Sequence, residues 1–131
     1  MAATNYLETA LLNTLKGRSF VRDEIYLALF TTYASETKSG TEPSDAAYER
    51  PKIEFCTPTV TSDGKETYIA NTNKILSKSA DENWGKIVSY GLFDAKTGGN
   101  LLIYGIMDNP QNVLSGQKFM IDERRLRVTL S

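Results

Sequence analysis

A lysine–threonine pair among glycines is the stretch of this sequence that comes nearest to a phosphate-binding loop. The pair is Lys96 and Thr97, within GLFDAKTGGN, residues 91–100. A phosphate loop needs a glycine directly before the lysine and a helix after the threonine, because the backbone amides at a helix N-terminus hold the anion. Ala95 stands before the lysine instead, and the run NLLIYGIM that follows the glycine pair is typical of a strand. We therefore expect a hairpin turn here and no nucleotide site.

Other groups that could carry catalysis or hold a metal are scarce. The chain has no histidine and a single cysteine, Cys56, which removes His-based acid–base catalysis and most zinc sites. The adjacent carboxylates Asp81 and Glu82, like Asp122 and Glu123, would point to opposite faces of an extended chain and are typical of solvated turns. We therefore predict a protein that is not an enzyme and that has no catalytic, cofactor-binding or metal-binding residue.

The aromatic residues allow two interpretations. Rings in the second half of the chain could form a platform for a sugar or a nucleic acid, but such rings more often fill a core or an oligomer interface. These rings belong to Trp84, Tyr90, Phe93, Tyr104 and Phe119. If the protein does bind a receptor or a carbohydrate, Tyr33, Tyr48 and Trp84 are the candidate aromatic contacts.

The charge pattern argues against a polyanionic partner. Fifteen basic and sixteen acidic residues give a net charge of −1, so we expect no nucleic acid and no membrane surface among the partners. The one basic cluster lies near the C-terminus, where strand alternation places Arg125 and Arg127 on one solvent face. These arginines either protect a sheet edge from unwanted pairing or form an ion pair with a neighbouring subunit.

The N-terminal segment, residues 1–17, predicts a short amphipathic helix capped by Asn5. Leu7, Leu11 and Leu15 recur at every fourth position and would form one apolar stripe. A helix of about three turns is marginal by itself, so this stripe must dock on the sheet or on another protein. The segment does not resemble a signal peptide, and no apolar run approaches the ~20 residues of a membrane helix. We expect synthesis in a cytoplasm without export.

The remainder, residues 23–131, predicts a mainly β domain, an antiparallel β-sandwich or jelly-roll-like fold of about eight strands. Residues 24–32 form a dense β-branched and aromatic run, typical of a strand buried on both faces. Residues 33–51 are the one long polar stretch, and we interpret them as a surface loop. With 131 residues and no linker, the whole chain is expected to form a single domain.

The order of these motifs resembles a family of small virion proteins of tailed bacteriophages. Its members show an aromatic-rich LFT strand, a GTE stretch followed by Y-x-R, a Trp-Gly pair, and a hairpin of the form GLFDAxxGGNLL. The matching positions are Leu29 to Thr31, Gly40 to Glu42 with Tyr48 and Arg50, Trp84 and Gly85, and Gly91 to Leu102. Members of this family are usually labelled tail-fibre or minor tail proteins, and related small β-domains serve as capsid decoration (cement) proteins.

The resemblance implies a non-enzymatic structural protein of the phage particle. A compact domain without a coiled coil or a repeat cannot form a long shaft, and an amphipathic helix suits docking on a lattice. We therefore favour an external capsid decoration protein, with a tail-associated, receptor- or carbohydrate-binding protein as the alternative. The expected partners are major capsid or tail proteins and further copies of the chain, a trimer being the natural guess. The apolar stripe, Arg125 and Arg127 are the candidate contacts.

Overall fold

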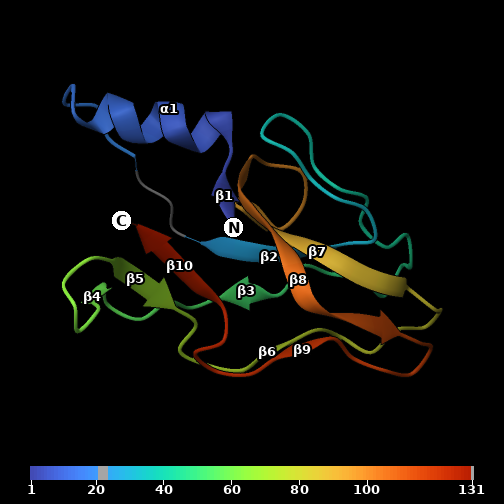
Figure 1. The fold of residues 1–131 in the computed structure, drawn as a ribbon. Coiled ribbons are helices and arrows are strands. Elements are labelled where there is room, and N and C mark those ends of the chain that lie inside the picture. The colour runs from blue at the N-terminus through green and yellow to red at the C-terminus, as the bar shows by residue number, and fades with distance from the viewer. Residues whose placement is uncertain (21–23, 131) are drawn as a thin grey trace.

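A five-stranded antiparallel sheet forms the centre of the molecule (Figure 1). The computed structural model describes residues 1–20 and 24–130, so Asp23, the first residue of the predicted sandwich, lies outside the described residues. The strand order is β1-β8-β7-β2-β3. Their bounds are β1 Ala2–Ala3, β8 Leu101–Val113, β7 Gly85–Phe93, β2 Ile25–Phe30 and β3 Lys52–Ile53.

Two smaller sheets complete the β structure. One has the order β10-β5-β4 and the other pairs β6 with β9, and Figure 1 shows both beside the larger sheet. Their bounds are β4 Thr59–Val60, β5 Thr67–Ala70, β6 Ile75–Leu76, β9 Met120–Ile121 and β10 Arg127–Leu130. The prediction of a mainly β, sandwich-like antiparallel domain with one N-terminal helix is confirmed. The described part of the chain has more strands than expected, because several pairings extend over only two residues.

Strand β2 is buried on both faces, as its sequence predicts. Leu27 and Leu29 point into the main core, which β6, β7 and the end of β8 also line. Ala28 and Phe30 point to the opposite face, where they form a second, smaller core with Phe93. The side chains of these four β2 residues, 27–30, are all fully inaccessible to solvent. The sheet thus needs a cover on each side, and polar loop residues provide the second one.

That cover comes from the predicted surface loop, residues 33–51. The structure places no helix or strand in this stretch, but its first part lies directly on the ring of Phe30. A Cβ atom on Gly40 would come within 2.6 Å of that ring, and one on Gly91 would come within 2.9 Å of it. Only glycine permits such a close approach. The loop therefore packs against the sheet as part of the fold and does not extend freely into solvent.

The stretch that contains Lys96 and Thr97 forms the turn of the β7–β8 hairpin, which confirms the prediction of a hairpin. Strands β7 and β8 pair in antiparallel register across the turn. Gly98 and Gly99 have φ angles of +60° and +74°, which other residues adopt only with strain. The side chain of Asp94 closes the turn by accepting a hydrogen bond of 2.8 Å from the Asn100 amide. No helix follows the turn, so the geometry that a phosphate loop requires is missing.

The predicted helix exists as α1, Asn5–Thr14, but its cap lies one residue earlier than expected. Thr4, not Asn5, is the N-cap, and its hydroxyl oxygen accepts a bond of 3.3 Å from the Leu7 amide. The same hydroxyl donates to the Leu101 carbonyl oxygen at 2.6 Å. A threonine can cap the helix and bind the sheet at once, whereas the sequence pattern shows only the cap.

Replacing Leu29 by Ala tests the central position of β2. Because Leu29 is fully buried in the main core, the variant should lose about 2–5 kcal/mol in the free energy of unfolding, measured by urea titration. Leu12→Ala is the matched control, since the Leu12 side chain is 65% exposed on α1, and it should change stability by about 0.5 kcal/mol or less. Similar values for the two variants would contradict this register.

Candidate functional site

Arg50 joins the 33–51 loop to the β7–β8 turn. Its guanidinium donates to the Glu42 carboxylate, with an Nη2–Oε1 distance of 2.6 Å, and Nη1 donates to the carbonyl oxygens of Ala95 and Gly98 at 2.9 and 2.8 Å. The guanidinium carbon also lies 3.8 Å from the centroid of the Phe93 ring. A planar fork with five donors can serve a carboxylate, two carbonyls and an aromatic face together, which an ammonium cannot. We call this group the Arg50 clamp.

A second buried polar group, Asp45, holds the middle of the same loop. One carboxylate oxygen accepts from the backbone amides of Asp81 and Glu82, at 2.8 and 3.0 Å, and from the Trp84 indole at 2.9 Å. The other accepts from the Ala47 amide at 3.0 Å. Hydrogen bonds from these donors, that of Ala47 first, lower the pKa of Asp45 to about 2. The carboxylate therefore stays ionised inside the fold.

Two of the three candidate receptor aromatics are structural. Trp84 is buried, and the Tyr48 ring packs edge-on against it with a centroid separation of 5.4 Å. The Tyr48 hydroxyl oxygen accepts a bond of 3.0 Å from the Leu29 amide, and burial raises the pKa of this phenol. Trp84 is therefore closed to stacking on a sugar, whereas Tyr48 is half-buried and stays a prediction as a receptor contact. Tyr33, whose side chain is 64% exposed, lies apart from them and stays a prediction.

The rings that could have formed a platform are mostly core. Trp84, Tyr90, Phe93 and Phe119 are buried, and Tyr104 is half-buried. This agrees with the interpretation that they fill the interior of the sandwich. Four of these five rings therefore carry the packing of the fold, and only Tyr104 among the five is more than marginally exposed.

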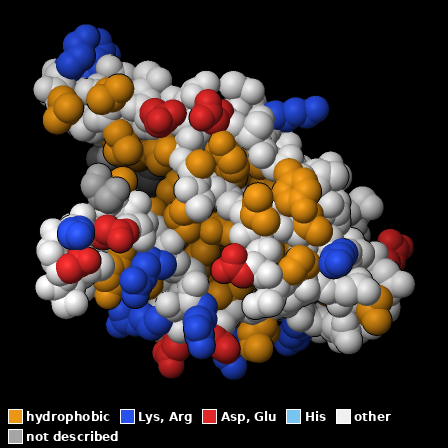
Figure 2. Space-filling view, in the orientation of Figure 1, with side chains coloured by type: hydrophobic (Ala, Val, Ile, Leu, Met, Phe, Trp, Pro, Cys, Tyr) orange, Lys and Arg blue, Asp and Glu red, His pale blue; other side chains and the backbone are white. Residues whose placement is uncertain are grey.

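The candidate contact residues of α1 separate into two kinds. Leu7 is buried against the domain, so it is unavailable for another protein. Leu11 is 40% exposed and Leu15 is 84% exposed. Figure 2 shows hydrophobic side chains along this helix and over the neighbouring face. The expected stripe thus docks on the domain only at its N-terminal end, and its contacts with other proteins stay a prediction.

The arginines Arg125 and Arg127 are both exposed, as strand alternation predicts. The Arg127 guanidinium lies over the Tyr68 ring, 3.7 Å from its centroid. The turn before them is held by Asn71, whose fully buried side chain accepts from the Leu126 amide at 2.9 Å and donates to the Asp122 carbonyl oxygen at 3.0 Å. The sequence analysis missed Asn71, because nothing in its local pattern marks it as buried.

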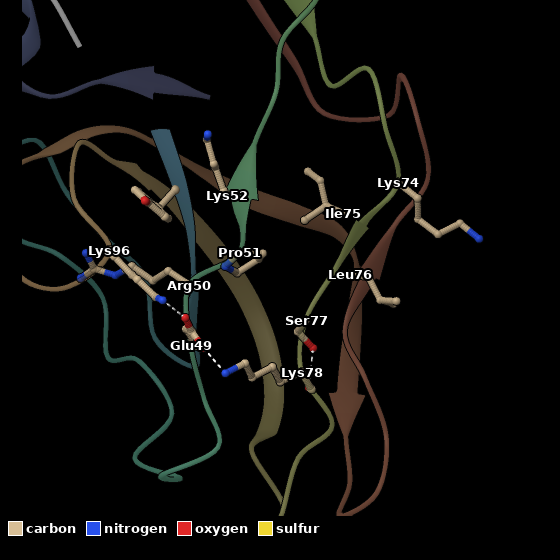
Figure 3. A pocket seen from close by; sticks show the side chains of 11 residues that line it. Glu49, Arg50, Pro51, Lys52, Lys74, Ile75, Leu76, Ser77, Lys78 and Lys96 are labelled. Atoms are coloured by element: carbon tan, nitrogen blue, oxygen red, sulfur yellow. Dashed lines mark hydrogen bonds and ion pairs between the residues drawn. The ribbon is translucent and has the colours of Figure 1, made fainter. Parts of the chain in front are cut away.

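A groove of about 460 Å³ opens beside the Arg50 clamp (Figure 3). One wall is the segment 49–52, which leads into β3, and the other is the segment 74–78, which contains β6. The Glu49 carboxylate forms ion pairs with Lys78 across the groove and with Lys96 on the hairpin turn. These two lysines lower the pKa of Glu49 to about 2, Lys78 having the larger effect. Lys96 therefore ties the turn to the loop.

The sequence analysis identified neither Glu49 nor Lys78 as part of a site. The three charged residues of this bridge are distant in the chain, and each is an ordinary surface residue in its local context. In the described part of the chain, no group of three or more His, Cys, Asp or Glu residues is placed to hold a metal ion. Within that part, no helix is both long and apolar enough to cross a membrane.

Removal of the Arg50 guanidinium tests the clamp. Arg50→Ala leaves the Glu42 carboxylate and two carbonyl oxygens without their donor, so we expect a loss of about 3 kcal/mol in the free energy of unfolding. Hydrogen exchange of the amides in residues 95–99 should also accelerate. Lys96→Gln, which breaks a half-exposed ion pair on the same turn, should cost about 1 kcal/mol or less. Equal effects of the two changes would count against the clamp.

Acid unfolding tests the ionised state of Asp45. Its pKa is about 2 in the folded protein against an ordinary value of 3.8, so the unfolded chain takes up the proton at higher pH than the folded one. The stabilisation is complete above about pH 4 and is lost as the pH falls towards 2. Urea midpoints, followed by Trp84 fluorescence, should therefore depend less on pH in Asp45→Asn. Asp122→Asn, at an exposed carboxylate, should retain the wild-type slope, and a retained slope in Asp45→Asn would refute the assignment.

Comparison with known protein families agrees with the resemblance seen in the sequence. The family described as podophage GP4 fiber I protein gp80 matches residues 2–129. No curated protein matches the chain. The match includes the loop, the β7–β8 hairpin and both walls of the groove, so it concerns the whole fold and not a single motif. The chain belongs to the podophage GP4 fiber I protein gp80 family, a family of phage fibre proteins.

Proposed function

We propose that the protein is a tail-associated structural component of a podophage particle, located in or on a tail fibre. The observation that carries this proposal is the match of residues 2–129 to a fibre-protein family. The family description favours the tail over the capsid, so the alternative of the sequence analysis has better support than the capsid decoration reading. A compact domain without a coiled coil cannot form a long shaft. A fibre, however, also has a base, joints and a tip, and a compact domain suits each of them.

The roles of the family motif residues support a non-enzymatic function. Glu42 and Arg50 form the clamp, the half-buried Tyr48 packs on the buried Trp84, and Gly91 gives room to Phe30. Each of these residues is used to hold the loop against the sheet. A motif that maintains shape is what a part of an assembly requires, because its surface must be presented in one arrangement.

The exposed part of α1 is where we propose contact with other virion proteins, including further copies of this chain. Leu11, Leu12 and Leu15 form an apolar surface beyond the docked first turn. Exposed apolar side chains that lie together are typical of an interaction site. A trimer is a natural arrangement, because virion components occupy symmetric positions.

Labelling of intact particles tests the placement. Antibodies against the protein, visualised by immunogold electron microscopy on purified phage, should mark the tail. Quantitative mass spectrometry should give a small number of copies per particle, in keeping with a symmetric tail structure. Label spread over the head together with hundreds of copies would favour capsid decoration, and absence from purified particles would refute both placements.

A further inference from the structure

The groove beside the Arg50 clamp has the character of an anion-binding site. Five basic side chains and one acidic side chain line it: Arg50, Lys52, Lys74, Lys78, Lys96 and Glu49. We propose that it binds a sugar unit carrying a carboxylate or a phosphate, as part of an acidic polysaccharide on a bacterial surface. The biological part of this inference rests on the proposed tail-associated function, whereas the binding chemistry rests on the groove alone.

The ion pairs inside the groove leave an uncompensated positive charge. Lys78 and Lys96 share the single carboxylate of Glu49, so these three groups together carry +1. Arg50 is neutralised by Glu42. Figure 3 shows the Lys78 and Lys96 side chains converging on Glu49 from opposite sides. An anion that enters the groove therefore meets two ammonium groups fixed around one carboxylate, at the point where the two walls are bridged.

These ammonium groups are oriented but still open to solvent. The Lys78 and Lys96 side chains are 69% and 56% exposed. Each ammonium has three N–H donors, and the bond to Glu49 uses only part of this capacity. The carboxylate thus holds both lysines in place before a ligand arrives, which lowers the entropy lost on binding. It also competes with the ligand for the same donors.

The walls of the groove suit a sugar ring better than a bare ion. Half-buried Pro51 provides apolar surface, and Ile75, which extends towards the opposite wall in Figure 3, is itself buried in the main core. The Ser77 hydroxyl serves the wall itself, because it donates to the Lys78 carbonyl oxygen at 2.9 Å and accepts from the Phe119 amide at 2.8 Å. Both walls are fixed by backbone bonds, from the Leu27 amide to the Pro51 carbonyl oxygen at 2.8 Å and from the Ser77 amide to the Phe119 carbonyl oxygen at 3.0 Å. The volume is within the range of small-ligand sites.

A nucleic acid fits these features less well. Binding along a phosphate backbone requires a basic stripe that continues over several repeats, whereas this chain has a net charge of −1. Lys52, at the other end of the groove, lies 3.5 Å from a Glu24 carboxylate oxygen and 3.3 Å from one of Glu54. The Lys74 side chain points away from the groove in Figure 3. The uncompensated positive charge inside the groove therefore lies at the bridge around Glu49.

Titration of the full chain with defined sugars, followed by NMR of the backbone amides, tests the proposal. Trigalacturonate provides the carboxylate arm and glucose 6-phosphate the phosphate arm, and maltotriose is the neutral control. We expect saturable shifts in residues 49–52, 74–78 and 96 with at least one acidic sugar and none with maltotriose. No saturable shift with either acidic sugar would overturn the proposal. So would inorganic phosphate or a single-stranded oligonucleotide binding as tightly as the acidic sugars.

Two substitutions in the bridge should change the affinity in opposite directions. Lys96→Gln removes one ammonium and should weaken binding of the acidic sugar about threefold or more. Glu49→Gln removes the competing carboxylate and should strengthen binding by a similar factor. Lys65→Gln is the matched control. Lys65 lies in the exposed turn between β4 and β5 and does not line the groove, so this change should leave the affinity for the acidic sugar unchanged. If the bridge served only to hold the walls together, both changes would weaken binding, and that result would refute the proposal.

The result of the sugar titration can be distinguished from the result of the particle labelling. A protein that marks the tail but binds no acidic sugar retains the proposed placement and loses the proposed ligand. A protein that binds the acidic sugars but is absent from particles retains the groove chemistry and loses the tail-associated function.

Discussion

The shape of this protein depends on how one guanidinium is accommodated. Arg50 is buried between the Glu42 carboxylate, two carbonyl oxygens of the β7–β8 turn and the face of Phe93. A buried positive charge is costly unless its donors are satisfied. The loop and the turn must therefore keep their relative positions, or the charge would remain unpaired. One side chain in this way couples a long irregular loop to the most regular hairpin of the fold.

Asp45 has the same effect in the middle of the loop. Its carboxylate accepts the indole and amide protons around Trp84, and Tyr48 packs on that indole while binding the β2 backbone. Polar side chains thus replace regular secondary structure as the means of fixing the loop. They also explain how a stretch rich in charged and small residues can form the second cover of the central sheet, over Phe30 and Phe93.

The groove is a consequence of this arrangement. Once the clamp fixes the chain before β3, Glu49 lies within reach of Lys78 beside β6 and of Lys96 on the turn. Three segments that are distant in sequence thereby contribute charge to one place. The proposed anion site is this preorganised and partly uncompensated cluster, on a protein whose net charge is only −1.

The sequence by itself determined the fold class, the N-terminal helix and the β7–β8 hairpin, because alternating apolar residues and paired glycines act through local geometry. It could not show that Asp45 is buried beside Trp84, or that Leu11 and Leu15 stay uncovered. A side chain's burial depends on which distant segments cover it. The tertiary structure alone decided the placement of Glu49, Lys78 and Lys96, since ion pairs form through space and leave no period in the sequence. For the same reason the groove could not be predicted from the sequence, whereas the family to which the chain belongs could.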